Sequence, residues 1–532
     1  MLKAIPAAAL IVAASAAAGG MIGAQSPAAG RDRINDRYRV YTAALAAIEQ
    51  QYVEPVEPAA AVYSSIDGLL RTLDPHSSFF DPNTYAQMRE RQEGRYPGIG
   101  VTIVAANDDV TVTALFEGSP AYKAGIRRGD VIAKVGTESA KGWTTRQVSD
   151  KIRGPKGTTV NVSIRRPGSD VLIELTVTRD EINITTVRAA FMMQPGTGYL
   201  RLADFSETSD EEIQTALKTL QGQGMERLVL DLRDNPGGLL DAAIGIASHF
   251  LKRGQMVVYT RGRVQNADKD YPAIRAGEYP TVPLVVMVSR GSASASEIVA
   301  GAMQDHDRAI IVGEQTFGKA LVQSVYRIAN SAGLALTTGR YYTPSGRLIQ
   351  RPWDGAFDDY LTYGLRDQQE HRDHAASELK YTDGGRKVYG GGGIEPDHFM
   401  PGPIEGFNPG YASRQLFSRQ LFAGFAEKFT GEGDDRPANR RAGNQRKVQR
   451  GFEITPEILG EFKTYVTAQH MKVDDAAFAA DVAFIKAMIH YEVDVDLFGM
   501  EEARRQLMKV DPQAQFALGF FDEAKALLVT KK

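Results

Sequence analysis

The chain has 532 residues and not one cysteine. A protein without thiols forms no disulfide framework, no thiolate nucleophile, no zinc–thiolate site and no iron–sulfur cluster. The chain also lacks an excess of one charge, because its 62 basic and 65 acidic residues leave a formal net charge of −3. Nothing in this balance points to nucleic acid or to an anionic membrane surface. With 43% hydrophobic and 24% charged residues, the composition is that of a multidomain globular protein.

Long apolar runs are absent except at the N-terminus, where Lys3 precedes an uncharged stretch over residues 4–24. A basic residue, an apolar run and a small residue at its end are typical of a signal peptide over residues 1–24. Ile22 is bulky for the position three before a cut after Ala24, and the run approaches the roughly 20 residues that span a bilayer. Retention as a membrane anchor and burial as an Ala-rich helix therefore stay open. Export predicts a periplasmic or extracytoplasmic protein, attached to the cytoplasmic membrane if the run is retained.

Helical periodicity dominates the chain after this run. Apolar residues lie three or four apart over residues 38–48 and again over residues 62–70, which predicts a small helical module over residues 33–93. The LDPHS motif at residues 73–77 ends the second helix, because proline disfavours helix in the residue before it and aspartate favours a turn. We interpret His76 as a residue of this turn.

Short strands replace the helices over residues 94–180, where β-branched residues alternate with polar ones. Two short helices are expected between them. One starts at Ser119, a capping residue followed by proline, and the other spans residues 144–152.

This segment resembles a PDZ domain. The resemblance rests on YPGIGV at residues 96–101, SPA at 119–121, AGIRRGD at 124–130 and RG at 153–154. PDZ domains bind an extended peptide as an added strand, and backbone N–H groups of a glycine-rich loop hold its terminal carboxylate. The resemblance implies that this loop consists of Gly98, Ile99 and Gly100.

Strands and helices alternate over residues 181–401, and this rhythm indicates an α/β core. Strand signals stop after that, and a polar, charged stretch predicts a linker region over residues 402–451. Helix starts with capping residues then predict a C-terminal helical domain over residues 452–532. The expected fold class is therefore α/β and multidomain, with helical regions at both ends.

A serine expected between a strand and a helix is the candidate nucleophile. Ser294 lies in the motif GSASASE at residues 291–297, where its hydroxyl can reach the carboxyl edge of the sheet. Serine attacks when a base takes its proton, and Lys319 can be that base if burial lowers the pKa of its amine. Gln323 can hold this amine through an uncharged hydrogen bond.

These residues closely resemble the C-terminal processing peptidases, the carboxy-terminal or tail-specific serine proteases. The resemblance covers roughly residues 33–400. Its further markers are LDPHS at residues 73–77, DLRDNPGG at 231–238, TFGK at 316–319 and GIEPD at 393–397.

The resemblance implies a serine protease core of the crotonase-like type that needs no metal and no other cofactor. It assigns Ser294 as the nucleophile, Lys319 as the general base and Gln323 as the orienting residue, and it excludes Ser292 and Ser296 as the nucleophile. It also implies an oxyanion hole formed by the backbone N–H groups of Gly238 and Ala295.

Several alternatives were weighed against this interpretation. His306 is the one histidine that we consider as another base for Ser294. A non-catalytic PDZ scaffold is disfavoured by the intact set of serine, lysine and glutamine. A protease of the chymotrypsin type would carry its PDZ domain after the protease domain, and a penicillin-recognising enzyme needs serine and lysine three residues apart, where this chain has Glu297.

The sequence thus predicts an exported serine endopeptidase that recognises polypeptide C-termini through its PDZ domain and cleaves through an acyl-enzyme. The expected partners are protein or peptide substrates with a free C-terminus, and no nucleic acid. A homo-oligomer, an adaptor protein and an N-terminal membrane anchor are left open as further partners.

Overall fold

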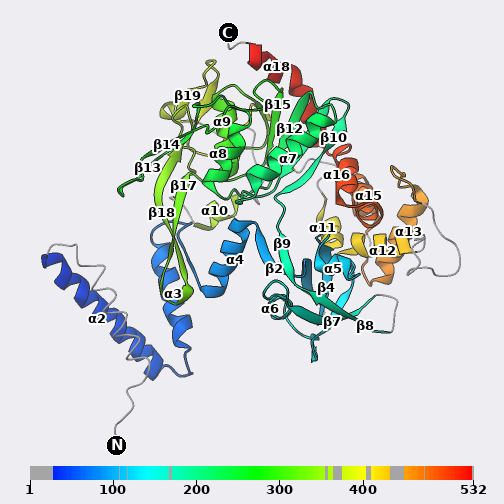
Figure 1. Ribbon diagram of the computed structural model, residues 1–532, viewed down its shortest axis with the longest axis horizontal. Helices are drawn as coiled ribbons and strands as arrows, with labels where there is room; N and C mark the ends of the chain where they lie inside the picture. The colour runs from blue at the N-terminus through cyan, green and yellow to red at the C-terminus, as the bar shows by residue number, and fades with distance from the viewer. Residues whose placement is uncertain are drawn as a thin grey trace, which may run out of the picture. The chain divides into compact units, whose positions relative to one another are not determined.

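A computed structural model describes residues 28–106, 108–116, 118–166, 171–353, 357–363, 374–402, 409–431, 448–472 and 474–529 (Figure 1). The chain divides into two compact units. The first consists of residues 1–87 and 323–338, and the second of residues 88–322 and 339–532. The expected signal or anchor segment 1–24 lies outside the described residues. Within them, no helix is both long and apolar enough to cross a membrane.

The first unit combines two helices with short strands. α2 (Ala28–Gln51) precedes α3 (Pro58–Arg71), where proline occupies the first turn and the preceding residue accepts a hydrogen bond from a backbone N–H. β1 (Ser78–Phe80) pairs with the first residues of β18 (Gly333–Tyr342), which also pairs with β17 (Leu321–Arg327). Between the units in sequence runs α4 (Pro82–Glu93).

The turn between α3 and β1 is held by Asp74. Its carboxylate accepts hydrogen bonds from the N–H groups of His76 and Ser77, both at 2.8 Å, and from the Ser77 hydroxyl at 2.7 Å. Burial acts to raise the pKa of Asp74, but these donors outweigh it and leave the pKa below its usual value. The LDPHS motif therefore ends the helix through aspartate as well as proline.

The PDZ segment forms a sheet with the order β3-β4-β5-β7-β8, in which β6 pairs with β5, while β2 pairs with β9. Both predicted helices are present, and Ser119 and Thr144 cap them by accepting hydrogen bonds from backbone N–H groups. The bounds are β2 (Arg95–Gly98), β3 (Val101–Ala106), β4 (Asp109–Leu115), α5 (Pro120–Lys123), β5 (Val131–Val135), β6 (Glu138–Ser139), α6 (Thr145–Ile152), β7 (Thr159–Arg165), β8 (Ile173–Thr178) and β9 (Asp180–Asn183).

A six-stranded sheet forms the centre of the second unit, in the order β10-β11-β12-β15-β16-β21. The β10–β11 pair is antiparallel and the other pairs are parallel. The strands are β10 (Val187–Gln194), β11 (Thr197–Leu202), β12 (Arg227–Asp231), β15 (Leu284–Val288), β16 (Ile310–Gly313) and β21 (His398–Phe399). Because β12 and β15 are parallel neighbours, the loops that follow them emerge at the same edge of the sheet.

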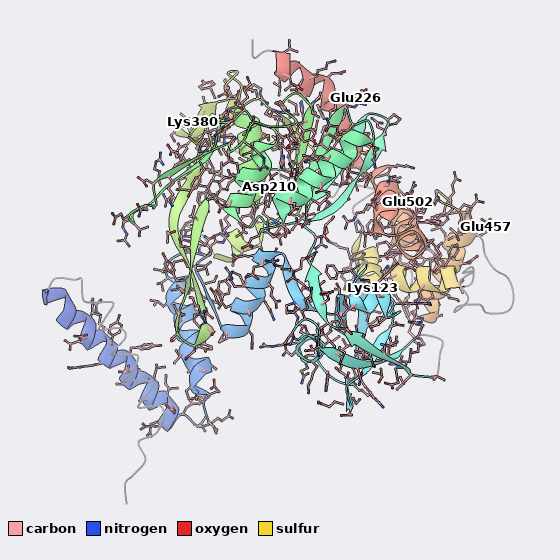
Figure 2. All side chains as sticks on the ribbon, in the orientation of Figure 1. Lys123, Asp210, Glu226, Lys380, Glu457 and Glu502 are labelled. Atoms are coloured by element: carbon pink, nitrogen blue, oxygen red, sulfur yellow. The ribbon has the colours of Figure 1, made fainter. Side chains whose placement is uncertain are left out.

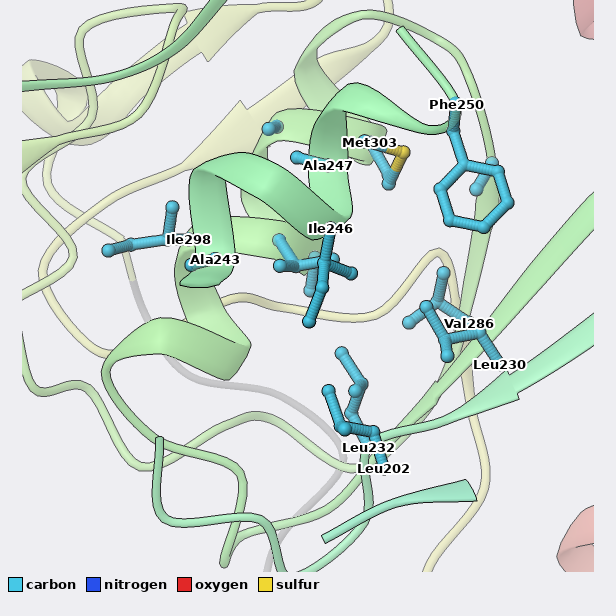
Figure 3. Packing of buried hydrophobic residues seen from close by; sticks show 14 of the residues in the cluster. Leu202, Leu230, Leu232, Ala243, Ile246, Ala247, Phe250, Val286, Ile298 and Met303 are labelled. Atoms are coloured by element: carbon cyan, nitrogen blue, oxygen red, sulfur yellow. The ribbon is translucent and has the colours of Figure 1, made fainter. Parts of the chain in front are cut away.

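Three helices cover one face of this sheet: α7 (Ser209–Gly222), α8 (Leu240–Ser248) and α9 (Ala295–Asp305). Figure 3 shows Ile246 of α8, Met303 of α9 and Val286 of β15 in the common core. All three are fully or almost fully buried. Smaller elements complete this side of the unit: β13 (Met256–Arg261), β14 (Lys269–Pro272), α10 (Phe357–Leu361), β19 (Leu379–Tyr381) and β20 (Lys387–Tyr389).

An ionic cluster joins α7 to α8. Asp210, labelled in Figure 2, lies 2.9 Å from Nε2 of the fully buried His249 and 2.5 Å from a guanidinium nitrogen of Arg275. Burial opposes ionisation, but these partners lower the pKa of Asp210 to about 2. The two helices approach closely here, because a Cβ on Gly245 would lie 2.8 Å from the carboxyl carbon of Asp210.

The opposite face of the sheet is covered by the end of the chain. Phe521, Ala524 and Met508 are buried against Tyr199, Val285 and other strand residues. The elements of this cover are α17 (Pro512–Ala517), a 3₁₀ turn (Leu518–Phe520) and α18 (Phe521–Val529).

The remaining C-terminal helices have a core of their own, rich in phenylalanine, with Phe422, Phe462 and Ile489 at its centre. They are α11 (Tyr411–Ser418), α12 (Leu421–Gly431), α13 (Pro456–Ala468), α14 (Asp475–Ala480) and α15 (Val482–Phe498). α16 (Met500–Met508) follows them and contributes Met508 to the cover of the sheet. The segment 452–532, expected to be one helical domain, thus contributes to two different cores.

Candidate active site

Ser294 lies between β15 and α9, directly before the first residue of the helix. Its backbone adopts φ 56° and ψ −113°, a conformation that L-residues rarely adopt outside functional turns. The side chain is only partly buried. The sequence predicted this position at a helix entrance; the backbone strain was not predictable from the residue type.

The two neighbouring serines are structural. The Ser292 hydroxyl donates to the carbonyl of Leu232 at 2.8 Å, and the Ser296 hydroxyl donates to the carbonyl of Asn235 at 2.9 Å. Both serines are fully buried. Their hydroxyls therefore fasten the turn that contains Ser294 to the loop that follows β12.

This loop brings Gly237 against Ser294 and Gly238 against Phe205. A Cβ on Gly237 would lie 2.8 Å from both Ala295 N and Ser294 Cβ, and one on Gly238 would lie 2.1 Å from the carbonyl oxygen of Phe205. Only glycine fits at these two positions, and Gly237 also has φ +94°. Within the described part of the chain, the N–H groups of Gly238 and Ala295 donate no hydrogen bond. They remain available to an oxyanion.

A buried carboxylate connects Ser294 to Lys319. Oε2 of Glu297 accepts hydrogen bonds from the backbone N–H of Ser294 at 2.7 Å and from that of Lys319 at 2.9 Å. Oε1 accepts from the Thr316 hydroxyl at 2.6 Å and the Gly318 N–H at 2.7 Å. One side chain thus fixes the backbone on both sides of the site, and Lys319 itself is partly buried.

Burial raises the pKa of Glu297 above its usual value, although four hydrogen bonds favour the ionised form. Tyr341, also buried, donates its hydroxyl to the Ser294 carbonyl at 3.2 Å, and burial followed by the Glu297 charge raises its pKa. Our sequence reasoning missed both residues as parts of the site. The pattern Ser-x-x-Glu at residues 294–297 is the signature of a capping box and could have drawn attention to Glu297.

His306 is wrong as an alternative base. It lies at the C-terminal end of α9, an eleven-residue helix that begins directly after Ser294, so the two residues are separated by about 18 Å along the axis. Its Nδ1 lies 2.8 Å from the Asp383 carboxylate and its Nε2 lies 2.7 Å from the Met256 carbonyl. His306 therefore holds the far end of the helix.

Comparison with known proteins identifies the family of this chain. Residues 196–360 match the model of peptidase family S41, and residues 111–166 match that of a PDZ domain. The chain is 39% identical over 307 residues to a carboxy-terminal-processing protease of Bartonella bacilliformis, which covers 57% of this chain and 70% of the relative. The chain belongs to the carboxy-terminal-processing protease family.

Two further relatives carry related names. A carboxyl-terminal-processing protease of Synechocystis is 38% identical over 312 residues, which is 57% of this chain and 72% of the relative. The solved structure of a photosystem II D1 C-terminal processing protease is 36% identical and covers 57% of this chain and 82% of its own, with a TM-score of 0.32. As a member of peptidase family S41, the processing protease described here is a serine-type peptidase with a PDZ domain.

Gln323 lies on β17, in the first unit of this processing protease. Its side-chain amide donates to the Thr337 hydroxyl at 3.3 Å, and the Thr337 N–H donates to the Ser77 hydroxyl at 3.2 Å. Ser77 in turn donates to Asp74. The LDPHS turn therefore reaches the strand pair that carries Gln323, whereas Ser294 and Lys319 are brought together within the second unit.

The expected peptide-binding loop of the PDZ domain lies between β2 and β3. Ile99 and Gly100 are buried, and their carbonyls accept hydrogen bonds from the N–H groups of Ala121 and Phe116. β3 follows the loop at one end of its sheet's strand order, so its outer edge can pair with an added strand.

Acidic and histidine side chains do not gather into a metal site in the described residues, where no three of them lie close enough to hold an ion. His374 lies between two carboxylates, with Nε2 at 3.1 Å from Glu395 and Nδ1 at 3.5 Å from Glu378. Its ring stacks on Tyr389 at a centroid distance of 4.0 Å.

Proposed function

We propose that this processing protease is an exported endopeptidase in which Ser294 attacks the scissile peptide bond with Lys319 as general base. The observation that carries the proposal is the Glu297 carboxylate, whose Oε2 accepts hydrogen bonds from the backbone of both residues. Gln323 is assigned as the residue that orients the lysine amine. The division into residues 33–93, 94–180, 181–401, 402–451 and 452–532, and the crotonase-like type of the core, belong to the same proposal.

Attack by Ser294 Oγ on the substrate carbonyl transfers its proton to the neutral amine of Lys319. The negative charge that develops on the carbonyl oxygen faces the N–H groups of Gly238 and Ala295, which the structure leaves available. Lys319 then gives its proton to the leaving amine, so that an acyl-enzyme forms on Ser294. Water, deprotonated by the same amine, hydrolyses this ester and restores the serine.

The PDZ domain is assigned the capture of a substrate's C-terminus. A chain that adds to β3 as a strand would place its carboxylate at Gly98, Ile99 and Gly100. Export follows from the N-terminal run of residues 1–24, and the periplasm or another extracytoplasmic space is the expected location, with attachment to the membrane if the run is retained. Self-association and an adaptor protein remain proposals of the same kind.

Substitution of the nucleophile and the base tests the mechanism. Ser294→Ala and Lys319→Ala should each lower the rate of cleavage of an unstructured peptide by about 10⁴-fold or more, because members of such a set act as a unit. Cleavage is followed by mass spectrometry, and labelling by a fluorophosphonate reports the serine directly. Ser418→Ala, an exposed serine that bonds only within its own helix, is the matched control.

Full activity of either variant would refute the assignment. If the wild-type protein binds free C-termini but neither cleaves peptides nor reacts with the fluorophosphonate, the scaffold alternative replaces the protease.

A further inference from the structure

The C-terminal helices connect to the loop that follows β12, and Asp511 is one of the residues that make this connection. It caps α17, where Oδ1 accepts hydrogen bonds from the N–H groups of Gln513 at 2.9 Å and Ala514 at 3.1 Å. Its other oxygen lies 2.9 Å from Nη1 of Arg233. This arginine belongs to residues 231–238, a segment that ends in Gly237, which lies beside Ser294, and Gly238.

Arg233 is almost completely buried and bridges two carboxylates. Its Nη2 lies 2.7 Å from Asp231 Oδ2, whereas its Nη1 makes the contact with Asp511. Asp231 also accepts hydrogen bonds from the Tyr199 hydroxyl and from Arg201. The set of Asp231, Arg201, Arg233 and Asp511 is thus neutral as a whole, and removal of Asp511 leaves one positive charge unpaired in a buried place.

Gln513, two residues after Asp511, extends this connection to the nucleophile turn. Its side-chain oxygen accepts a hydrogen bond from Nη1 of Arg233 at 2.9 Å, and its amide donates to the Met400 carbonyl at 3.2 Å. The Gly402 carbonyl, two residues further, accepts a hydrogen bond from Arg290 of the nucleophile turn. Arg290 is itself held by Glu314, with Nε at 2.9 Å from Oε1.

We propose that Asp511 and Gln513 are positioning residues for the protease reaction, acting through Arg233 and Arg290 on the two loops that meet at Ser294. One loop carries Gly238, the assigned oxyanion donor, and the other carries the nucleophile. The inference rests on the proposed function, because it assumes these roles for Gly238 and Ser294. Asp511 and Gln513 themselves touch neither Ser294 nor Gly238, so their effect is on geometry alone.

The test compares two glutamines of the same helix. Gln513→Ala removes the contacts with Arg233 and Met400, whereas Gln515→Ala removes only a hydrogen bond to the nearby Met508 carbonyl from an exposed side chain. Asp511→Asn keeps a good helix cap but removes the charge. For each full-length variant, kcat and KM are measured on a peptide and divided by the number of active sites titrated with a fluorophosphonate.

Gln513→Ala and Asp511→Asn should lower kcat per titrated site by about 10-fold, at a KM within about twofold of wild type, since small misplacements of reacting groups have large effects on rate. Gln515→Ala should match the wild type. Unchanged kcat per titrated site in both test variants overturns the inference. This holds even if fewer active sites are titrated in the variants, because a smaller number of active sites would reflect impaired folding alone. If Asp511→Asn does not fold, Gln513→Ala decides.

Ser294→Ala in the same assay separates the two proposals. Cleavage by Ser294→Ala overturns the proposed function itself. An inactive Ser294→Ala together with fully active Gln513→Ala and Asp511→Asn overturns only the positioning role.

Discussion

Replacement of Glu297 by glutamine separates the stability of the site from its activity. The two side chains have the same shape, but glutamine has one oxygen where glutamate has two. Whichever way the amide points, its NH₂ group faces two donors, either Ser294 N–H and Lys319 N–H or Thr316 hydroxyl and Gly318 N–H. The variant therefore loses two of the four hydrogen bonds.

The expected magnitudes differ for the two properties. Two lost hydrogen bonds to a charged acceptor cost about 1.5–3 kcal/mol each, while removal of a buried charge recovers several kcal/mol of desolvation. We expect the free energy of unfolding to change by no more than about 2 kcal/mol. The effect on kcat should be larger than the effect on stability, because a backbone N–H that loses its acceptor allows Ser294 or Lys319 to move. A displacement of about 1 Å lowers kcat by about 10²-fold, which corresponds to about 2.7 kcal/mol.

The pH dependence of stability gives an independent check. Because the folded-state pKa of Glu297 lies above its usual value of 4.5, its stabilising contribution is complete below that value and is lost as the pH rises through the folded pKa. The glutamine variant has no such loss. Its deficit relative to the wild type should therefore shrink between acidic and neutral pH in urea denaturation.

The control is Glu278→Gln, an exposed glutamate of the same unit, which should leave both kcat and stability unchanged within about 0.5 kcal/mol. A Glu297→Gln variant with wild-type kcat would refute the reasoning, because the two backbones would then be held by other contacts.

Two further predictions concern the oxyanion loop and the PDZ domain. Gly237→Ala should lower kcat by about 10²-fold, because its Cβ would meet Ala293 O and Ala295 N at 2.7–2.8 Å. Gly254→Ala, which has a similar positive φ but nothing within 4 Å, should lose about 1 kcal/mol of stability and no activity, and equal activities of the two variants would contradict the close approach. Amidation of a substrate's C-terminal carboxylate should raise its KM by about 10-fold or more, and equal rates for the amidated and free peptides would count against capture by residues 98–100.

Part of the core could be predicted because strands such as β15 are uninterrupted runs of apolar residues. β15 is a run of five apolar residues, all of them buried, and helices are present where the sequence predicts them, after Ser119 and within residues 144–152. The shorter strands β1, β19 and β20 have no such signal, since two or three residues contain no period.

The candidate site was predictable where a motif carries it and not where it depends on distant contacts. Ser294 was found from small residues between a strand and a helix. The role of Glu297 depends on a pairing with residues 316–319, and that of Asp511 on a contact with Arg233 across more than half of the chain. These contacts leave no pattern in the local sequence, because the partners come together only when the chain folds.

α17 and α18 cover one face of the central sheet. This arrangement affects the order in which parts of the protein can fold. Domains generally fold as units while the chain is still being made. The central sheet of the second unit exposes Val285 and Tyr199 until Phe521 and Ala524 have been synthesised. The buried layer that contains Val285 and Tyr199 therefore stays incomplete until the chain has been synthesised as far as Ala524.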